Sequence, residues 1–123
     1  MNINEFIKEL ENEKNRIAEE IQKKQESERR AKEKERKHRL ICRKFTNYCE
    51  NNKLNLVICI NNKYRFEYFD VFKILFEISD NFEIDIVSYT INESDLERKI
   101  KVFDHIERII KAVNNIVDDI NHN

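Results

Sequence analysis

The residues best suited to do chemistry in this chain are the cations between Gln22 and Lys44. This segment holds eleven Lys and Arg against four Glu, a net charge of +7, although the net charge of the whole chain is −1. Positive charge gathered in one segment is typical of a surface that binds an anionic partner. Phosphate is the natural ligand of such a surface, because the Arg guanidinium is a permanently charged, two-pronged donor.

This basic segment predicts a helix with its cations on one side. It contains no Gly or Pro and consists mainly of residues that favour helix. At about 100° per residue, five cations share a stripe that contains no Glu. The stripe is formed by Arg29, Lys32, Arg36, Arg39 and Arg43, and it is flanked by Arg30, Lys34, Lys37 and Lys44. We expect this surface to bind nucleic acid or a nucleoprotein complex.

A solvated spacer is the other interpretation of the same helix. Four Glu residues stand four positions before a cation, and each such pair stabilises an exposed helix by about 0.2–0.5 kcal/mol. The pairs are Glu26/Arg30, Glu28/Lys32, Glu33/Lys37 and Glu35/Arg39. On the side opposite the stripe, Ile41, Phe45, Tyr48 and Cys49 predict packing on a core. The stripe favours binding and the interleaved Glu favour a spacer, so both interpretations stay open.

Catalytic motifs are sparse in this sequence. The chain has no Gly, which a P-loop, a dinucleotide-binding fingerprint and a nucleophile elbow all require. Asp80, Glu83 and Asp85 could serve a metal-dependent nuclease, but no Lys follows at the expected position, and capping or strand-edge charge explains them more simply. We therefore expect a protein that is not an enzyme and that uses no cofactor.

The cysteines predict reduced thiols in an intracellular protein. Cys42, Cys49 and Cys59 are odd in number and lack CxxC spacing. His38 and Cys42 could begin a zinc site, but no second pair of ligands is evident, so we expect buried thiols and no metal. The acidic start does not suit a signal peptide, and no apolar run is long enough to span a membrane.

The order of hydrophobic patterns predicts an α+β fold with the order α-β-β-α-β-α. The expected elements are a long N-terminal helix ending near Asn51–Asn52, a β-hairpin of Leu54–Ile60 and Tyr64–Phe69, a short helix over Asp70–Ser79 with Asp70 as N-cap, a third strand over Glu83–Ile91 and a long C-terminal helix. A right-handed crossover would place the third strand parallel to the second, with the long helices on one face. We expect one domain over 1–123, in which 1–45 form a helix able to project and 50–123 the globular part.

Local patterns add detail to these elements. A three-residue turn at Asn61–Lys63 would set Ile60 opposite Tyr64, Ile58 opposite Phe66 and Leu56 opposite Tyr68. The aromatic residues of the second strand could stack on RNA bases, but a core position is the better interpretation. The apolar phase slips near Ile86 and Val87, which predicts a β-bulge. Without Gly, Asn and Asp should occupy positions of positive φ.

The two long helices each carry an apolar stripe. The C-terminal helix should begin at Ser94 with a capping box to Glu97. Its stripe is Leu96, Phe103, Ile106, Ile110, Val113, Val117 and Ile120, widened by Ile100, Ile109 and Ile116. The N-terminal stripe is Ile3, Ile7, Leu10, Ile17 and Ile21, with Lys14 interrupting. It requires a helical partner, either the C-terminal helix or a second copy. A homodimer through helices, as a scaffold or oligomerisation protein, is thus the alternative function.

The first ten residues also carry a resemblance. Met1-Asn2-Ile3-Asn4, with Ile7 and Glu9, resembles the start of a small phage-encoded anti-CRISPR inhibitor of type II Cas9. That inhibitor is acidic and imitates DNA, whereas this chain carries a basic helix, so the resemblance transfers no site residue and no mechanism. It implies an inhibitor or regulator from a phage or mobile element, which the small size of the chain suits.

Overall fold

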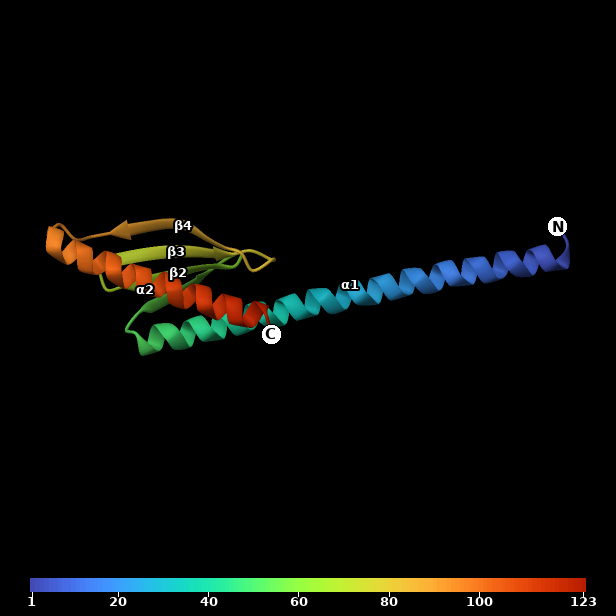
Figure 1. The fold of residues 1–123 in the computed structure, drawn as a ribbon, viewed down its shortest axis with the longest axis horizontal. Coiled ribbons are helices and arrows are strands. Elements are labelled where there is room, and N and C mark those ends of the chain that lie inside the picture. Colours follow the sequence, from blue (N-terminus) through green and yellow to red (C-terminus); the bar gives the residue numbers. More distant parts are fainter. The chain divides into compact units, whose positions relative to one another are not determined.

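The computed structural model describes all 123 residues as an α+β protein. The elements are α1 (Ile3–Asn51), β1 (Asn55–Cys59), β2 (Lys63–Tyr68), β3 (Phe72–Ile78), β4 (Ile84–Ile91) and α2 (Leu96–Asn121) (Figure 1). The chain divides into two compact units, Met1–Glu35 and Arg36–Asn123. The fold class, the two long helices and the β-hairpin are confirmed, but the predicted order of elements is not.

The segment predicted to be a short helix is strand β3. Its buried side chains alternate with more exposed ones and are Phe72, Ile74, Phe76 and Ile78. Alternation is the period of a strand. Val71 and Leu75 obscure it in the sequence, because they add apolar residues on the other face and so make the run fit either period. Pairing with β2 on one side and β4 on the other fixes the strand.

The sheet is wholly antiparallel, in the order β1-β2-β3-β4. The expected parallel third strand is therefore wrong, since a tight turn replaces the helical crossover. In that turn the Val71 N–H donates to the Tyr68 carbonyl at 3.0 Å, and Phe69 has a φ of 46°. Strand β4 pairs only with β3, so it forms one edge of the sheet.

The first hairpin has a loop of the predicted length, three residues, but neither the predicted loop residues Asn61–Lys63 nor the predicted register. The loop is Ile60–Asn62, which sets Ile58 opposite Tyr64, Leu56 opposite Phe66 and Cys59 opposite Lys63. Asn61 and Asn62 have φ values of 64° and 58°, so both left-handed residues belong to the loop. The register differs from the expected one by two residues. An even shift keeps every side chain on its predicted face.

The bulge predicted in the last strand is confirmed. Phe76 lies opposite Ile86 while Leu75 lies opposite Ser88, so Val87 is the extra residue. The bulge changes the alternation of β4. Ile86 and Tyr89 consequently both lie opposite buried residues of β3, namely Phe76 and Ile74, on the side of the sheet that faces the helices.

Both helices of the second unit cover one face of the sheet, as predicted. Phe45 of α1 packs edge-to-face on Tyr64 and Phe66, with ring centroids 5.0 and 5.3 Å apart. His105 of α2 packs edge-on against Tyr68 on the same face, and the two ring centroids are 4.7 Å apart. The helical residues of the core are Ile41, Phe45 and Cys49 from α1 and Val102, Ile109, Val113, Val117 and Ile120 from α2.

The side of α2 that faces the core differs from the predicted stripe. Val113, Val117 and Ile120 are buried as expected, but Leu96 and Phe103 are exposed. Ile109, one of the residues predicted to widen the stripe, is buried, and Val102, which was not in the stripe, also takes a core position. Apolar residues surround much of this helix, so only packing on the sheet decides which of them are buried.

The helix ends follow capping rules with small shifts in position. Helix α1 ends at Asn51 as expected, in a Schellman motif where the Leu54 N–H donates to the Cys49 carbonyl at 2.9 Å. The left-handed residue there is Lys53, with φ 59°, and not an Asn. Helix α2 is capped by Asp95, whose carboxylate accepts the Arg98 N–H at 2.9 Å, and not by Ser94.

Positive φ is less restricted to Asn than expected. Besides Asn61, Asn62 and Lys53, Phe69 and Phe82 have φ values of 46° and 64°. An aromatic residue is disfavoured in the left-handed region because its Cβ crowds the backbone. At Phe82 the ring has a packing partner in this conformation. It stacks on His38, with ring centroids 4.7 Å apart.

Candidate nucleic-acid interface

The basic stripe is presented by α1, and three of its arginines belong to the second unit. Arg36, Arg39 and Arg43 are spaced i, i+3, i+7 and are exposed, as is the adjacent Lys44. We refer to Arg36, Arg39 and Arg43 as the basic face. The opposite side of the same turns holds the buried residues Ile41, Phe45 and Cys49. The core therefore fixes the rotation of the helix, and the basic face lies on its solvent side.

Lys37, predicted to flank the stripe, has a structural contact. Its Nζ donates to the carbonyl of Asn121 at 2.9 Å and lies 5.9 Å from the centroid of the Phe82 ring. A cation at the last carbonyls of a helix satisfies an unpaired acceptor and favours the negative end of the helix dipole. Lys37 thus caps α2, and we do not count it with the basic face.

Arg29 and Arg30, which lie in the first unit, share one carboxylate. Glu26 accepts from Arg29 Nη2 at 2.6 Å and from Arg30 Nε at 3.2 Å. The hydrogen bond from Arg29 is the main reason why the pKa of Glu26 is lowered to about 2. The expected Glu26/Arg30 pair is confirmed. The Arg29 contact was not predicted, because Glu26 lies outside the stripe, although an i,i+3 neighbour is close enough to pair with Arg29. Lys32 and Lys34 are exposed on this segment.

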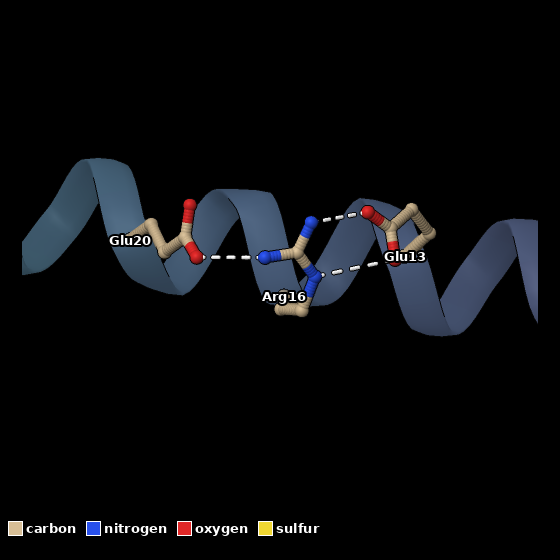
Figure 2. A network of polar contacts seen from close by, with 3 residues as sticks. All are labelled: Glu13, Arg16 and Glu20. Atoms are coloured by element: carbon tan, nitrogen blue, oxygen red, sulfur yellow. Dashed lines mark hydrogen bonds and ion pairs between the residues drawn. The ribbon is translucent and has the colours of Figure 1, made fainter.

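The N-terminal apolar stripe lies wholly on the surface of the first unit. Its five residues, Ile3, Ile7, Leu10, Ile17 and Ile21, are all exposed, and Phe6, which the sequence pattern did not include, is exposed with them. Ion pairs along the helix accompany this stripe. Arg16 forms ion pairs with both Glu13 and Glu20 (Figure 2). Its Nη1 lies 2.7 Å from Oε1 of Glu20. The pKa of Glu13 is lowered by its hydrogen bond from Arg16.

The aromatic residues of β2 belong to the core, as predicted. Tyr64 and Phe66 are buried against Phe45, and burial raises the pKa of the Tyr64 hydroxyl. Their ring faces are covered by protein, so the sheet offers no stacking platform for bases at these positions. Tyr68 is half-buried and stacks on Phe72.

The candidate metal ligands do not assemble in this fold. No group of three or more His, Cys, Asp and Glu side chains is arranged to hold a metal ion. Cys49 is buried in the core, and burial raises the pKa of its thiol to about 11. His38 stacks on Phe82. The structure therefore forms neither a zinc site around His38 and Cys42 nor a metal site for a nuclease from Asp80, Glu83 and Asp85.

One titratable residue of the second unit was not singled out from the sequence. His105 packs edge-on against both Tyr68 and Phe72, with ring centroids 4.7 and 5.2 Å away. Burial lowers its pKa, and the charge of Arg108 lowers it further. No sequence signal pointed to this contact, because it depends on how α2 crosses the sheet.

No family model, no curated protein and no solved structure matches the chain. None of its helices combines the length and the apolar character that crossing a membrane would need.

Proposed function

We propose that this protein binds nucleic acid, alone or within a nucleoprotein, through the basic face of α1. The observation that carries the proposal is the placement of Arg36, Arg39 and Arg43 on the solvent side of a helix whose other side is buried. A rigid row of guanidinium groups can contact successive phosphates without reading base sequence. Lys44, Lys32 and Lys34 supply further exposed positive charge on the same helix.

A salt titration tests this proposal. Binding of the full chain to duplex DNA, single-stranded DNA and RNA should weaken steeply as salt rises, because each phosphate contact releases counterions. The variant with Arg36→Gln, Arg39→Gln and Arg43→Gln should lose affinity, and the slope of log K against log salt should fall in magnitude by about 2–3 for duplex DNA.

A matched control separates the basic face from total charge. The variant with Lys8→Gln, Lys14→Gln and Lys101→Gln removes the same number of exposed cations elsewhere on the chain. It should keep nearly the slope of the natural protein. Absence of binding at low salt, or equal losses in the two variants, would overturn the proposal and direct attention to an acidic protein surface as the partner.

The exposed N-terminal stripe supports a second candidate, which is self-association through helices. Its residues recur at the 3–4 spacing of a helical seam over residues 3–21, with Lys14 at one seam position. Dissociation of an oligomer of the natural chain by a Leu10→Glu, Ile17→Glu variant would support this candidate. The inhibitor role implied by the resemblance to an anti-CRISPR protein stays a prediction, and loss of Cas9 inhibition in the basic-face variant would be its test.

A further inference from the structure

The second unit carries an apolar surface that its own helices leave uncovered. Coverage of the sheet ends between β3 and β4, since Ile74 and Phe76 of β3 are buried while their partners Tyr89 and Ile86 on β4 are not. The exposed fractions are 49% for Ile86, 65% for Tyr89, 77% for Leu96, 62% for Ile100 and 48% for Phe103. These five residues, from β4 and the first turns of α2, are called the β4–α2 patch.

The patch is continuous across the two elements. A hollow of about 180 Å³ lies between them and is lined by Ile86 and Tyr89 of β4 and by Phe103, Ile106 and Ile110 of α2, together with Ile74 and Ile91. On α2, Leu96, Ile100 and Phe103 are spaced i, i+4, i+7 and so form one ridge beside this hollow. The next turn on that side is polar, with Glu107 paired to Lys111 at 3.5 Å.

The size of the patch fits one half of a protein–protein interface. Large apolar and aromatic side chains bury roughly 150–250 Å² each, so five that are about half exposed present on the order of 500 Å². Monomeric proteins rarely expose larger contiguous apolar areas, and a standard interface covers about 800 Å² per partner. The edge of β4 and the polar residues around the patch would supply the remaining area of such an interface.

The strand beside the patch indicates what covers it. The outer edge of β4 pairs with no other strand, and its eight residues include no Lys and no Pro, so the bulge at Val87 is the one edge-protecting feature of this strand. Its one charged residue, Asp85, lies near an end. Antiparallel pairing of β4 with itself would therefore set Asp85 opposite the far end of the other strand, with no like charges facing.

We propose that a second copy of this chain docks on the β4–α2 patch in a two-fold dimer. The two β4 strands pair antiparallel into one continuous sheet. A two-fold axis perpendicular to the sheet keeps the helices of both copies on the same face and makes the two α2 helices antiparallel. The patches of both copies then lie on the same face of the joined sheet, and the part of α2 beside Ile86 and Tyr89, around Phe103 and Ile106, comes nearest the axis.

Sedimentation equilibrium over a concentration series tests the dimer. The natural chain should reach twice its mass of 15.1 kDa. An Ile100→Glu, Phe103→Glu variant should raise the dissociation constant at least roughly thirtyfold, the size expected for central interface residues. Both residues are exposed, and an unchanged unfolding midpoint of the dilute variant shows that its fold is intact. A chain that stays monomeric at every concentration overturns the proposal.

Two controls separate this interface from other surfaces. The Leu10→Glu, Ile17→Glu variant should dimerise normally; if it alone becomes monomeric, the N-terminal stripe holds the copies together and this proposal is wrong. Amide hydrogen exchange gives the second readout. The β4 amides should exchange more slowly as concentration rises in the natural chain, and not in the Ile100→Glu, Phe103→Glu variant. Concentration-independent β4 exchange in a dimer would refute strand pairing.

Discussion

Helix α1 contains two segments that hold their helical form for different reasons. From Ile3 to Glu35 no side chain is buried, and the stabilising contacts are local, such as Arg16 with Glu13 and Glu20. From Arg36 to Asn51 the same helix buries Ile41, Phe45 and Cys49 in the core. Local ion pairs contribute tenths of a kcal/mol, whereas a buried aromatic residue contributes several. The first segment thus leaves its surface for partners, and the second is required by the fold.

The largest difference between the two segments is expected when one apolar side chain is removed from each of them. Phe45→Ala should lower the free energy of unfolding by about 3–5 kcal/mol, because it leaves a cavity between α1 and the sheet. Leu10→Ala should change it by no more than about 0.5 kcal/mol, since Leu10 is exposed. Urea unfolding followed by circular dichroism and tyrosine fluorescence measures both. Equal losses would show that the first segment also belongs to the cooperative core.

A smaller effect is expected at Lys37, where a cation of the second segment supports the fold. Lys37→Met keeps most of the aliphatic stem but removes the hydrogen bond to the Asn121 carbonyl. The free energy of unfolding should fall by about 1 kcal/mol. Lys44→Met is the matched control, because Lys44 is exposed and should be neutral for stability. If the two variants unfold alike, the contact with α2 adds nothing.

The two compact units should also differ in their response to pH, because the second unit holds a half-buried histidine on α2. The pKa of His105 is lowered from 6.5 in the second unit, so the unfolded chain takes up this proton first as the pH falls. Stability from this group is complete above about pH 6.5 and declines as the pH falls through the folded pKa. The urea midpoint should fall more steeply with decreasing pH in the natural chain than in His105→Phe, and unfolding curves measured across this pH range would show it. Parallel curves would contradict the burial of the imidazole.

The smallest effect belongs to Glu26 in the first segment. Its pKa of about 2 lies below the ordinary 4.5, so its ion pairs persist above that value and are lost as the pH falls through about 2. Glu26→Gln should lower helicity only locally, detected as faster amide exchange near Arg29 and Arg30. Glu28→Gln serves as the control, and a carboxyl carbon titration by NMR reads the Glu26 pKa directly.

The predictable part of this structure is the part encoded by local pattern. Unbroken helix formers predicted α1, and the phase slip at Ile86 and Val87 predicted the bulge. Strand β3 was missed because a short run rich in apolar residues fits a helix and a strand alike until its neighbours pair with it. The contact of Lys37 with Asn121 was beyond reach, since the two residues are 84 positions apart. The β4–α2 patch was hidden for a similar reason, because only packing shows which apolar side of α2 stays exposed.

The hydrogen bond between Lys37 and Asn121 also bears on how the chain folds as it is made. It joins the beginning of the second unit to the final turn of α2. While the ribosome is still adding the sheet, Ile41, Phe45 and Cys49 have no complete core to enter. The nascent chain therefore exposes the apolar side of this helix until α2 has emerged. A nascent chain stalled before α2 should be bound by chaperones and digested by proteases.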